Sequence, residues 1–148
     1  MSHHEIQLTW TRQTPDFQYD TYDRTHSLVF AGGQKIAASS APEYLGRAEN
    51  ANPEEMLAAS LASCHMLTFL AVAAKSRFVV DSYLDRAVAV LEKNEDGRLA
   101  VTEIILNPKI QFSGEKVPDA EQLKALHDKA HRNCFIGNSI KARVTVKE

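Results

Sequence analysis

The longest uncharged stretch of the chain, Met56–Ala74, runs for nineteen residues without Asp, Glu, Lys or Arg. Helix-start signals precede it. Asn52 is a candidate N-cap and Pro53 suits the first helical position. Glu54 and Glu55 place negative charge at the positive end of the helix dipole, and Glu55 also occupies the capping-box position. The pattern therefore predicts a long helix beginning at residue 53.

This stretch is almost as long as the roughly 20 apolar residues that span a membrane. Its composition argues against a membrane span, because eight of the nineteen residues are Ala or Ser. Cys64, His65 and Thr68 add further polarity. Small residues favour close packing against other protein, so we expect a buried helix of a soluble protein and no membrane association.

Alternation of apolar and polar residues predicts strands on both sides of the helix. Those before it are expected at Glu5–Thr11, Thr21–Phe30 and Lys35–Ala38, with a turn at Gly32-Gly33 and a loop over Ser39–Ala51.

Strands are expected again after the helix, at Tyr83–Lys93, Leu99–Phe112 and Ile140–Val146. Asp96-Gly97 predicts a hairpin turn, and Asn107-Pro108 an interruption of the sheet. A second helix is expected to open at Pro118-Asp119, with Leu123, Leu126, His127, Ala130 and Cys134 on one face. This order predicts a single α+β domain over residues 1–148.

The amino-acid composition limits the classes of function to be considered. The chain has 148 residues, 44% apolar and 24% charged, with a net charge of −2 and scattered Lys and Arg, which does not favour nucleic-acid binding. The N-terminus lacks the basic and apolar regions of a signal peptide, so we expect a cytoplasmic protein. No Gly-rich phosphate loop or dinucleotide fingerprint occurs in the sequence, and no metal, flavin, haem or nicotinamide cofactor is expected.

The two cysteines, Cys64 and Cys134, both fall on apolar faces of predicted helices. A buried cysteine often only fills space, but cysteines in a cytosolic protein more often serve reactivity or metal binding than a disulfide framework. One chemistry is thiol oxidation, in which a thiolate attacks a peroxide and the sulfenic acid condenses with a second thiol. The other is a metal site, with His127, His131 and Cys134 on one helix face and Cys64 or His65 completing it.

Two segments resemble the OsmC/Ohr family, in an atypical branch. "NPEEMLAASLASC" (52–64) is similar to the family's first cysteine motif, and "AHRNCFIGNSIKARVTV" (130–146) to its second. The resemblance covers nearly the whole chain. It implies antiparallel sheets packed around a long buried central helix, in an intertwined homodimer. It also implies reduction of organic hydroperoxides, with a dithiol such as dihydrolipoamide or a lipoylated protein as reductant.

Carried onto this sequence, the resemblance makes Cys64 the peroxidatic thiol and Cys134 the resolving thiol. Glu54 matches the family's acidic position. An arginine should activate the thiol, and two are candidates: Arg24, in "YDRTH", and Arg47, in "YLGRAENANPEE". We favour Arg24, because Tyr22 and His26 beside it are suited to line a site.

The substrate pocket is expected to include His65, Phe69 and Phe135. His65 and Phe135 depart from the residues that usually follow the two cysteines in the family. Besides lining the pocket, His65 is a candidate for a core histidine, for tuning the thiol or for binding another group. Ten residues of helix rise about 15 Å, so Glu54 cannot reach Cys64 along one straight helix. If both serve one site, either the helix breaks or Glu54 comes from a partner chain, which supports a dimer. A non-enzymatic binder of a small apolar ligand is the remaining alternative.

Overall fold

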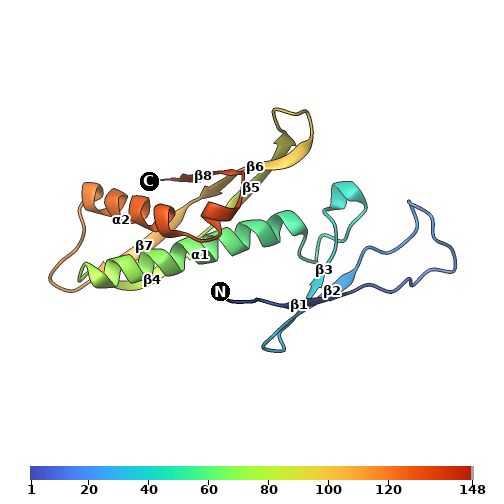
Figure 1. Ribbon diagram of the computed structural model, residues 1–148, viewed down its shortest axis with the longest axis horizontal. Coiled ribbons are helices and arrows are strands. Elements are labelled where there is room, and N and C mark those ends of the chain that lie inside the picture. Colours follow the sequence, from blue (N-terminus) through green and yellow to red (C-terminus); the bar gives the residue numbers. More distant parts are fainter. Residues whose placement is uncertain (148) are drawn as a thin grey trace. The chain divides into compact units, whose positions relative to one another are not determined.

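The computed structural model describes residues 1–147 and divides into two compact units, Met1–Met56 and Leu57–Glu148 (Figure 1). Each unit is described by itself below. The expectation of a single domain stays a prediction.

The first unit contains a three-stranded antiparallel sheet in the order β1-β2-β3. Its strands are β1 (Ile6–Thr9), β2 (His26–Phe30) and β3 (Lys35–Ala38), followed by the short 3-10 helix η1 (Pro42–Tyr44). The predicted turn between β2 and β3 is confirmed, and Gly33 there adopts a φ of 88°, which favours glycine. The strand predicted over Thr21–Phe30 begins only at His26. The residues before it form turns, in which the Thr25 amide donates to the Asp23 carboxylate at 2.7 Å.

Helix α1 spans Pro53–Lys75, as its start signals predict. Asn52 and Glu55 form a reciprocal cap: the Glu55 amide donates to Asn52 Oδ1 at 2.9 Å, and the Asn52 amide donates to Glu55 Oε2 at 3.2 Å. Two backbone donors that the first turn would leave without a partner are thereby satisfied. The helix ends at Lys75, and Arg77 just beyond it adopts a left-handed φ of 64°.

The second unit holds two sheets. A two-stranded antiparallel sheet pairs β4 (Val79–Asp85) with β7 (Pro108–Ser113), and a three-stranded sheet has the order β5-β6-β8. The latter consists of β5 (Val88–Lys93), β6 (Leu99–Leu106) and β8 (Arg143–Val146). The predicted hairpin at Asp96-Gly97 joins β5 to β6, and the predicted interruption separates β6 from β7. The β6–β8 pair is parallel.

Helix α2 (Ala120–Asn133) begins with a capping box between Asp119 and Gln122. It is followed by the 3-10 helix η2 (Gly137–Ser139). Two core clusters contain side chains of α1. The first cluster joins Phe69, Val72 and Ala73 of α1 to Phe78, Leu126 and Ala130. The second joins Ala58 and Leu61 of α1 to Ile104, Leu106 and Cys134.

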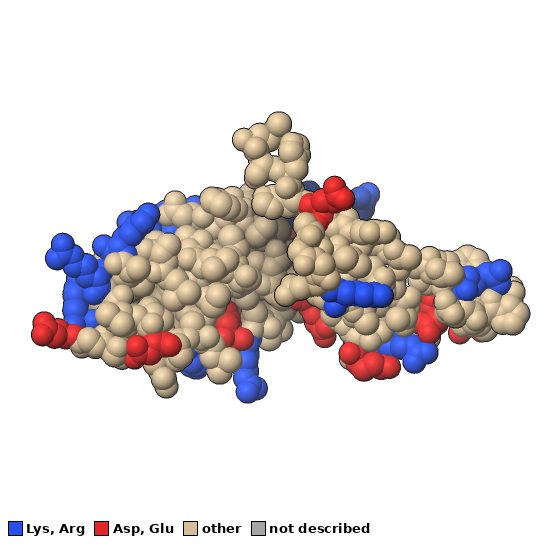
Figure 2. Space-filling view, turned by 90° about the horizontal axis from the view of Figure 1, so that it is seen from below, with Lys and Arg blue, Asp and Glu red and all other residues tan. Residues whose placement is uncertain are grey.

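One side of α1 is exposed although it carries no charge between Met56 and Ala74. Its exposed positions there are small or apolar: Ala59, Ser60, Ser63, Leu67, Ala71 and Ala74. On the left of Figure 2, where the second unit lies, charged side chains gather at the margins around a largely uncharged area. By length and composition α1 is long and apolar enough to cross a membrane, but the core helix of a soluble protein passes the same test, and the fold is compatible with a soluble protein.

Candidate active site

The two cysteines come together in the second core cluster. Cys134, at the C-cap of α2, is one of its buried members, and Cys64, in the middle of α1, packs against it. Both are free thiols. Residues 70 apart in sequence thus place two sulfur atoms in one apolar environment, which is the arrangement that the redox interpretation requires.

Cys134 is the more protected thiol, with 1% of its surface exposed. Burial raises its pKa to about 11, with a further contribution from its hydrogen bond to Cys64. The Gly137 amide, which donates to Cys134 Sγ at 3.3 Å, acts in the opposite direction but does not offset burial. Cys134 therefore remains protonated at neutral pH, so Cys64, which is only partly buried, is the better candidate for the attacking thiolate.

Gly137 lies next to Cys134 and Leu61. A Cβ at Gly137 would lie 3.4 Å from Cys134 Sγ and 3.7 Å from Leu61 Cδ1. These are ordinary van der Waals distances, so a Cβ at position 137 fits beside the thiol and Leu61.

The two candidate arginines, both in the first unit, differ in how their charge is balanced. Arg47 pairs with Asp23 at 2.9 Å and with Glu49 at 3.7 Å. The pKa of Asp23 is lowered to about 2, chiefly by its hydrogen bonds from Thr25 and then by that from Arg47.

Arg24 is held by neutral groups. Its guanidinium donates to the carbonyls of Tyr22 at 2.9 Å and Tyr19 at 2.5 Å, and it lies 4.0 Å from the centre of the Tyr22 ring. Among the described residues no carboxylate pairs with Arg24, so its charge is the less neutralised of the two. Neither arginine forms an ion pair with Glu54 in the described part of the chain. The cysteines belong to the other unit, so activation of Cys64 by Arg24 or Arg47, and the role of Glu54, stay predictions.

The three predicted pocket residues lie in different surroundings. Phe69 is fully buried in the first core cluster, whereas Phe135, next to Cys134, is 80% exposed. His65 is buried, and its Nε2 lies 3.0 Å from Nδ1 of His127. Lining of a substrate pocket by these residues stays a prediction. The His65–His127 pair was not predicted, because the sequence pattern indicates burial of each histidine but not which residue it contacts.

The metal interpretation finds no support in this geometry. Cys134 lies in the second core cluster, while His127 contacts Phe69 of the first, with ring centroids 4.5 Å apart. Within residues 1–147 no group of three or more His, Cys, Asp or Glu side chains is placed to hold a metal ion.

Fold and thiols together define a class: an α+β protein with a cysteine pair between its long central helix and the end of its second helix. The family profile described as OsmC-like protein matches residues 46–148, and the chain belongs to this family. Its structure is similar to that of an OsmC-like protein of unknown function from Vibrio cholerae, with a TM-score of 0.95, 43% identity and 99% of each chain covered.

More distant solved structures share the fold. The organic hydroperoxide resistance protein from Elizabethkingia anophelis has a TM-score of 0.73 and 18% identity, covering 99% of this chain and 94% of that one. The organic hydroperoxide resistance protein OhrB of Bacillus subtilis has a TM-score of 0.69 and 20% identity, covering 99% and 96%. No curated protein matches the chain.

Proposed function

We propose that the protein is a thiol-dependent peroxidase that reduces organic hydroperoxides to alcohols as a defence against peroxide stress. The observation that carries this proposal is the meeting of Cys64 and Cys134 in one apolar cluster, in a family that includes organic hydroperoxide resistance proteins. Apolar surroundings suit an organic rather than an inorganic peroxide.

In the first step the Cys64 thiolate attacks the O–O bond of the hydroperoxide. A sulfur–oxygen bond forms, the alkoxide leaves and takes a proton to become the alcohol, and Cys64 is oxidised to a sulfenic acid. In the second step the Cys134 sulfur attacks the Cys64 sulfur, and a disulfide forms with loss of water. A dithiol, such as dihydrolipoamide or a lipoyl group on a protein, then reduces the disulfide and is itself oxidised to a disulfide.

The raised pKa of Cys134 supports this division of roles. A buried Cys134 that stays protonated does not compete for the peroxide. It becomes useful only once Cys64 is oxidised, because a sulfenic acid condenses readily with a neighbouring thiol. Arg24, whose charge no described carboxylate balances, is our candidate for stabilising the Cys64 thiolate, with Arg47 as the alternative and Glu54 as the acid that orients it.

The active form that we propose is a homodimer. An uncharged helix face carrying Leu67, which is 60% exposed, suits close contact with a second copy. A partner chain would also provide Glu54 to the site, because the rise of one straight helix keeps Glu54 of the same chain too far from Cys64. Gel filtration that finds only monomer at working concentrations would contradict this part of the proposal.

The reaction is tested by counting thiols and measuring intact mass after one equivalent of cumene hydroperoxide, with hydrogen peroxide as the comparison oxidant. We expect rapid loss of both thiols and of 2 Da with the organic peroxide. The matched control is Cys134→Ser, which should still react at Cys64 but gain one oxygen, because no resolving thiol is present. Unchanged peroxide consumption in Cys64→Ser would show that Cys64 is not the reacting thiol.

A further inference from the structure

A concave surface rich in aromatic rings lies in the first unit, where the end of β1 meets the turns that precede β2. Its volume is about 320 Å³, which is at the lower end of the range of small-molecule sites. Neither cysteine lines this surface, and all of its residues belong to the first unit. The surface, called the aromatic cup below, is lined by Leu8, Trp10, Phe17, Tyr22, Arg24 and His26.

Three rings form the apolar wall of the cup. The ring centroids of Trp10 and Phe17 are 5.9 Å apart, those of Trp10 and Tyr22 are 6.2 Å apart, and those of Phe17 and Tyr22 are 5.0 Å apart. The ring planes meet at angles between 41° and 87°. Aromatic rings attract a further ring in such tilted and edge-to-face arrangements. Because Trp10 and Phe17 are exposed, the wall offers ring surface to a ligand.

Hydrogen bonds hold the turns that carry these rings. The indole Nε1 of Trp10 donates to the carbonyl of Asp23 at 2.7 Å. The guanidinium of Arg24 donates to the carbonyls of Tyr22 and Tyr19. The cup is therefore formed before a ligand binds, which lowers the entropy that binding costs.

Two polar side chains, Arg24 and His26, line the cup beside the rings. A guanidinium has five N–H donors, and the two carbonyl bonds of Arg24 use two of them. His26 Nδ1 lies 2.9 Å from the carbonyl oxygen of Arg24, and because a carbonyl only accepts, Nδ1 carries a proton. In the neutral imidazole Nε2 is then an acceptor. Donors from Arg24 and an acceptor from His26 together complement a hydroxyl group.

The charges at the cup argue against ionic ligands. Arg24 lies 4.0 Å from the centre of the Tyr22 ring, so the place of a cation on that ring is already occupied. No Asp or Glu is among the residues that line the cup. A carboxylate would accept from Arg24 but has no proton to donate to His26 Nε2. A neutral hydroxyl compound satisfies both polar side chains.

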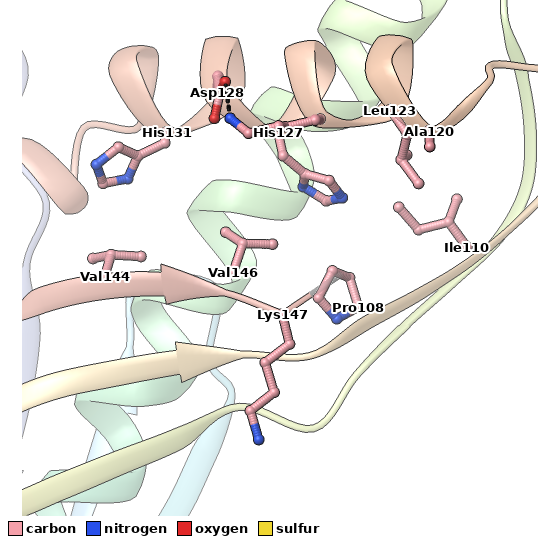
Figure 3. Close-up of a pocket in the computed structure, with 11 residues that line it drawn as sticks. Pro108, Ile110, Ala120, Leu123, His127, Asp128, His131, Val144, Val146 and Lys147 are labelled. Carbon is pink, nitrogen blue, oxygen red and sulfur yellow. Dashed lines mark hydrogen bonds and ion pairs between the residues drawn. The ribbon is translucent and has the colours of Figure 1, made fainter.

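The second unit contains a cavity with a different lining, between α2 and strands β7 and β8 (Figure 3). Its volume is about 400 Å³, and its wall includes the aliphatic side chains of Ile110, Leu123 and Val144. Lys124 and Asp128 at this cavity form an ion pair of 2.8 Å. None of the described residues that line it is Phe, Tyr or Trp. A ligand selected for its aromatic ring is therefore expected in the aromatic cup.

We propose that the aromatic cup binds a small neutral aryl alcohol, a molecule with one aromatic ring and one hydroxyl group. The ring packs against Leu8, Trp10 and Phe17. The hydroxyl oxygen accepts from Arg24, and the hydroxyl hydrogen is donated to His26 Nε2. The proposal goes beyond the peroxidase activity and does not rest on it, because no cysteine takes part in binding.

Trp10 is the single tryptophan of the sequence, so it reports on the cup directly. The test is a titration of the full-length protein with 2-phenylethanol, followed by tryptophan fluorescence, excited where the ligand does not absorb, and by the indole ¹H–¹⁵N signal. We expect a saturable change in both signals, with one site per chain. Binding should be at least tenfold weaker for 2-cyclohexylethanol, which lacks the aromatic ring. It should also be at least tenfold weaker for 2-phenylethylammonium, which adds a positive charge beside Arg24.

Variants at Phe17 test the assignment of the cup. Phe17→Ala, a change at an exposed position, should weaken binding of 2-phenylethanol at least tenfold. Phe17→Leu keeps an apolar side chain without the ring and should also weaken binding, which separates loss of the ring from loss of local packing. The matched control is Tyr44→Ala, which removes an exposed aromatic side chain of the first unit outside the cup and should bind 2-phenylethanol normally.

Three results would overturn the proposal. One is the absence of a saturable response of Trp10 to 2-phenylethanol, including the case in which the Trp10 signal depends on protein concentration because a second copy covers the cup. Another is equal affinity for 2-phenylethanol and 2-cyclohexylethanol, which would mean that no aromatic ring is recognised. The third is wild-type affinity in both Phe17 variants. Binding that persists in Cys64→Ser/Cys134→Ser would support the site whatever the outcome of the peroxidase assay.

Discussion

The buried His65 imidazole makes the stability of the protein sensitive to mild acid. His65 is 1% exposed, and its pKa is lowered from 6.5 to about 4 in the folded chain. The unfolded chain therefore takes up a proton at a higher pH than the folded chain does. The stability that His65 contributes is complete above pH 6.5 and is lost as the pH falls toward 4.

The size of this effect follows from the difference between the two pKa values. One pKa unit corresponds to about 1.4 kcal/mol, so the full difference is worth about 3 kcal/mol. Linkage predicts that about 1.4 kcal/mol is lost by pH 5.5 and about 2.5 kcal/mol by pH 4.5. A loss of this size is a substantial fraction of the 5–15 kcal/mol that holds a typical domain folded.

The assay is urea unfolding between pH 7.5 and 4.5 at one fixed protein concentration, comparing the wild type with His65→Leu. At pH 7.5 the variant should be less stable by about 1–3 kcal/mol, because His127 Nδ1 loses its buried partner. As the pH falls the two curves should converge, since only the wild type must protonate His65. His4→Leu, at an exposed position, should follow the wild-type curve.

Comparing two variants at each pH removes the contributions of other titrating groups, such as Asp23 and Asp128, whose pKa values are lowered in the fold. A His65→Leu curve that runs parallel to the wild type over the whole range would refute the reasoning. It would mean that the unfolded and folded chains protonate His65 alike.

Two further predictions concern the cysteine pair and the start of α2. At pH 8 iodoacetamide should modify Cys64 well before Cys134, because Cys134 is buried and its pKa is about 11. Peptide mass mapping at early times measures the order of labelling. Faster labelling of Cys134 would reverse the assigned roles. Asp119→Ala should lower the free energy of unfolding by about 1 kcal/mol, because the backbone amide of Gln122 loses the Asp119 carboxylate to which it donates at 2.8 Å. Glu121→Ala is the control at a neighbouring position. Equal urea midpoints for the two variants would contradict the capping role of Asp119.

The sequence correctly predicted those elements that are determined by residues close to them in the chain. The start of α1 was predicted because Asn52, Pro53 and Glu55 satisfy its first turn from within five residues. The hairpin between β5 and β6 was predicted from the turn at Gly97, which adopts a φ of 73°. The cysteine pair was predicted with the help of the family resemblance, because no local pattern indicates that residues 70 apart share one cluster.

The sequence pattern was less informative where tertiary contacts decide the structure. The stretch predicted as one strand over Tyr83–Lys93 is divided between two sheets, because β4 ends at Asp85, where its carboxylate accepts the Asn107 amide at 2.7 Å. The contact between His65 and His127, 62 residues apart, depends on how α2 packs on α1. Periodicity can indicate that each histidine is buried, but it cannot identify the partner.

The parallel pairing of β8 with β6 has a consequence for biosynthesis. Arg143 of β8 contacts Glu103 of β6 across 40 residues of chain. Because β8 follows β6 by that distance, it leaves the ribosome well after β6, and until then one edge of β6 has no partner strand. Closing so long a loop is slow relative to helix formation, and an unpaired edge is a template for association with other chains. The newly made chain is therefore most prone to aggregate between the release of β6 and the release of β8, and a truncation that removes β8 would make that exposure permanent.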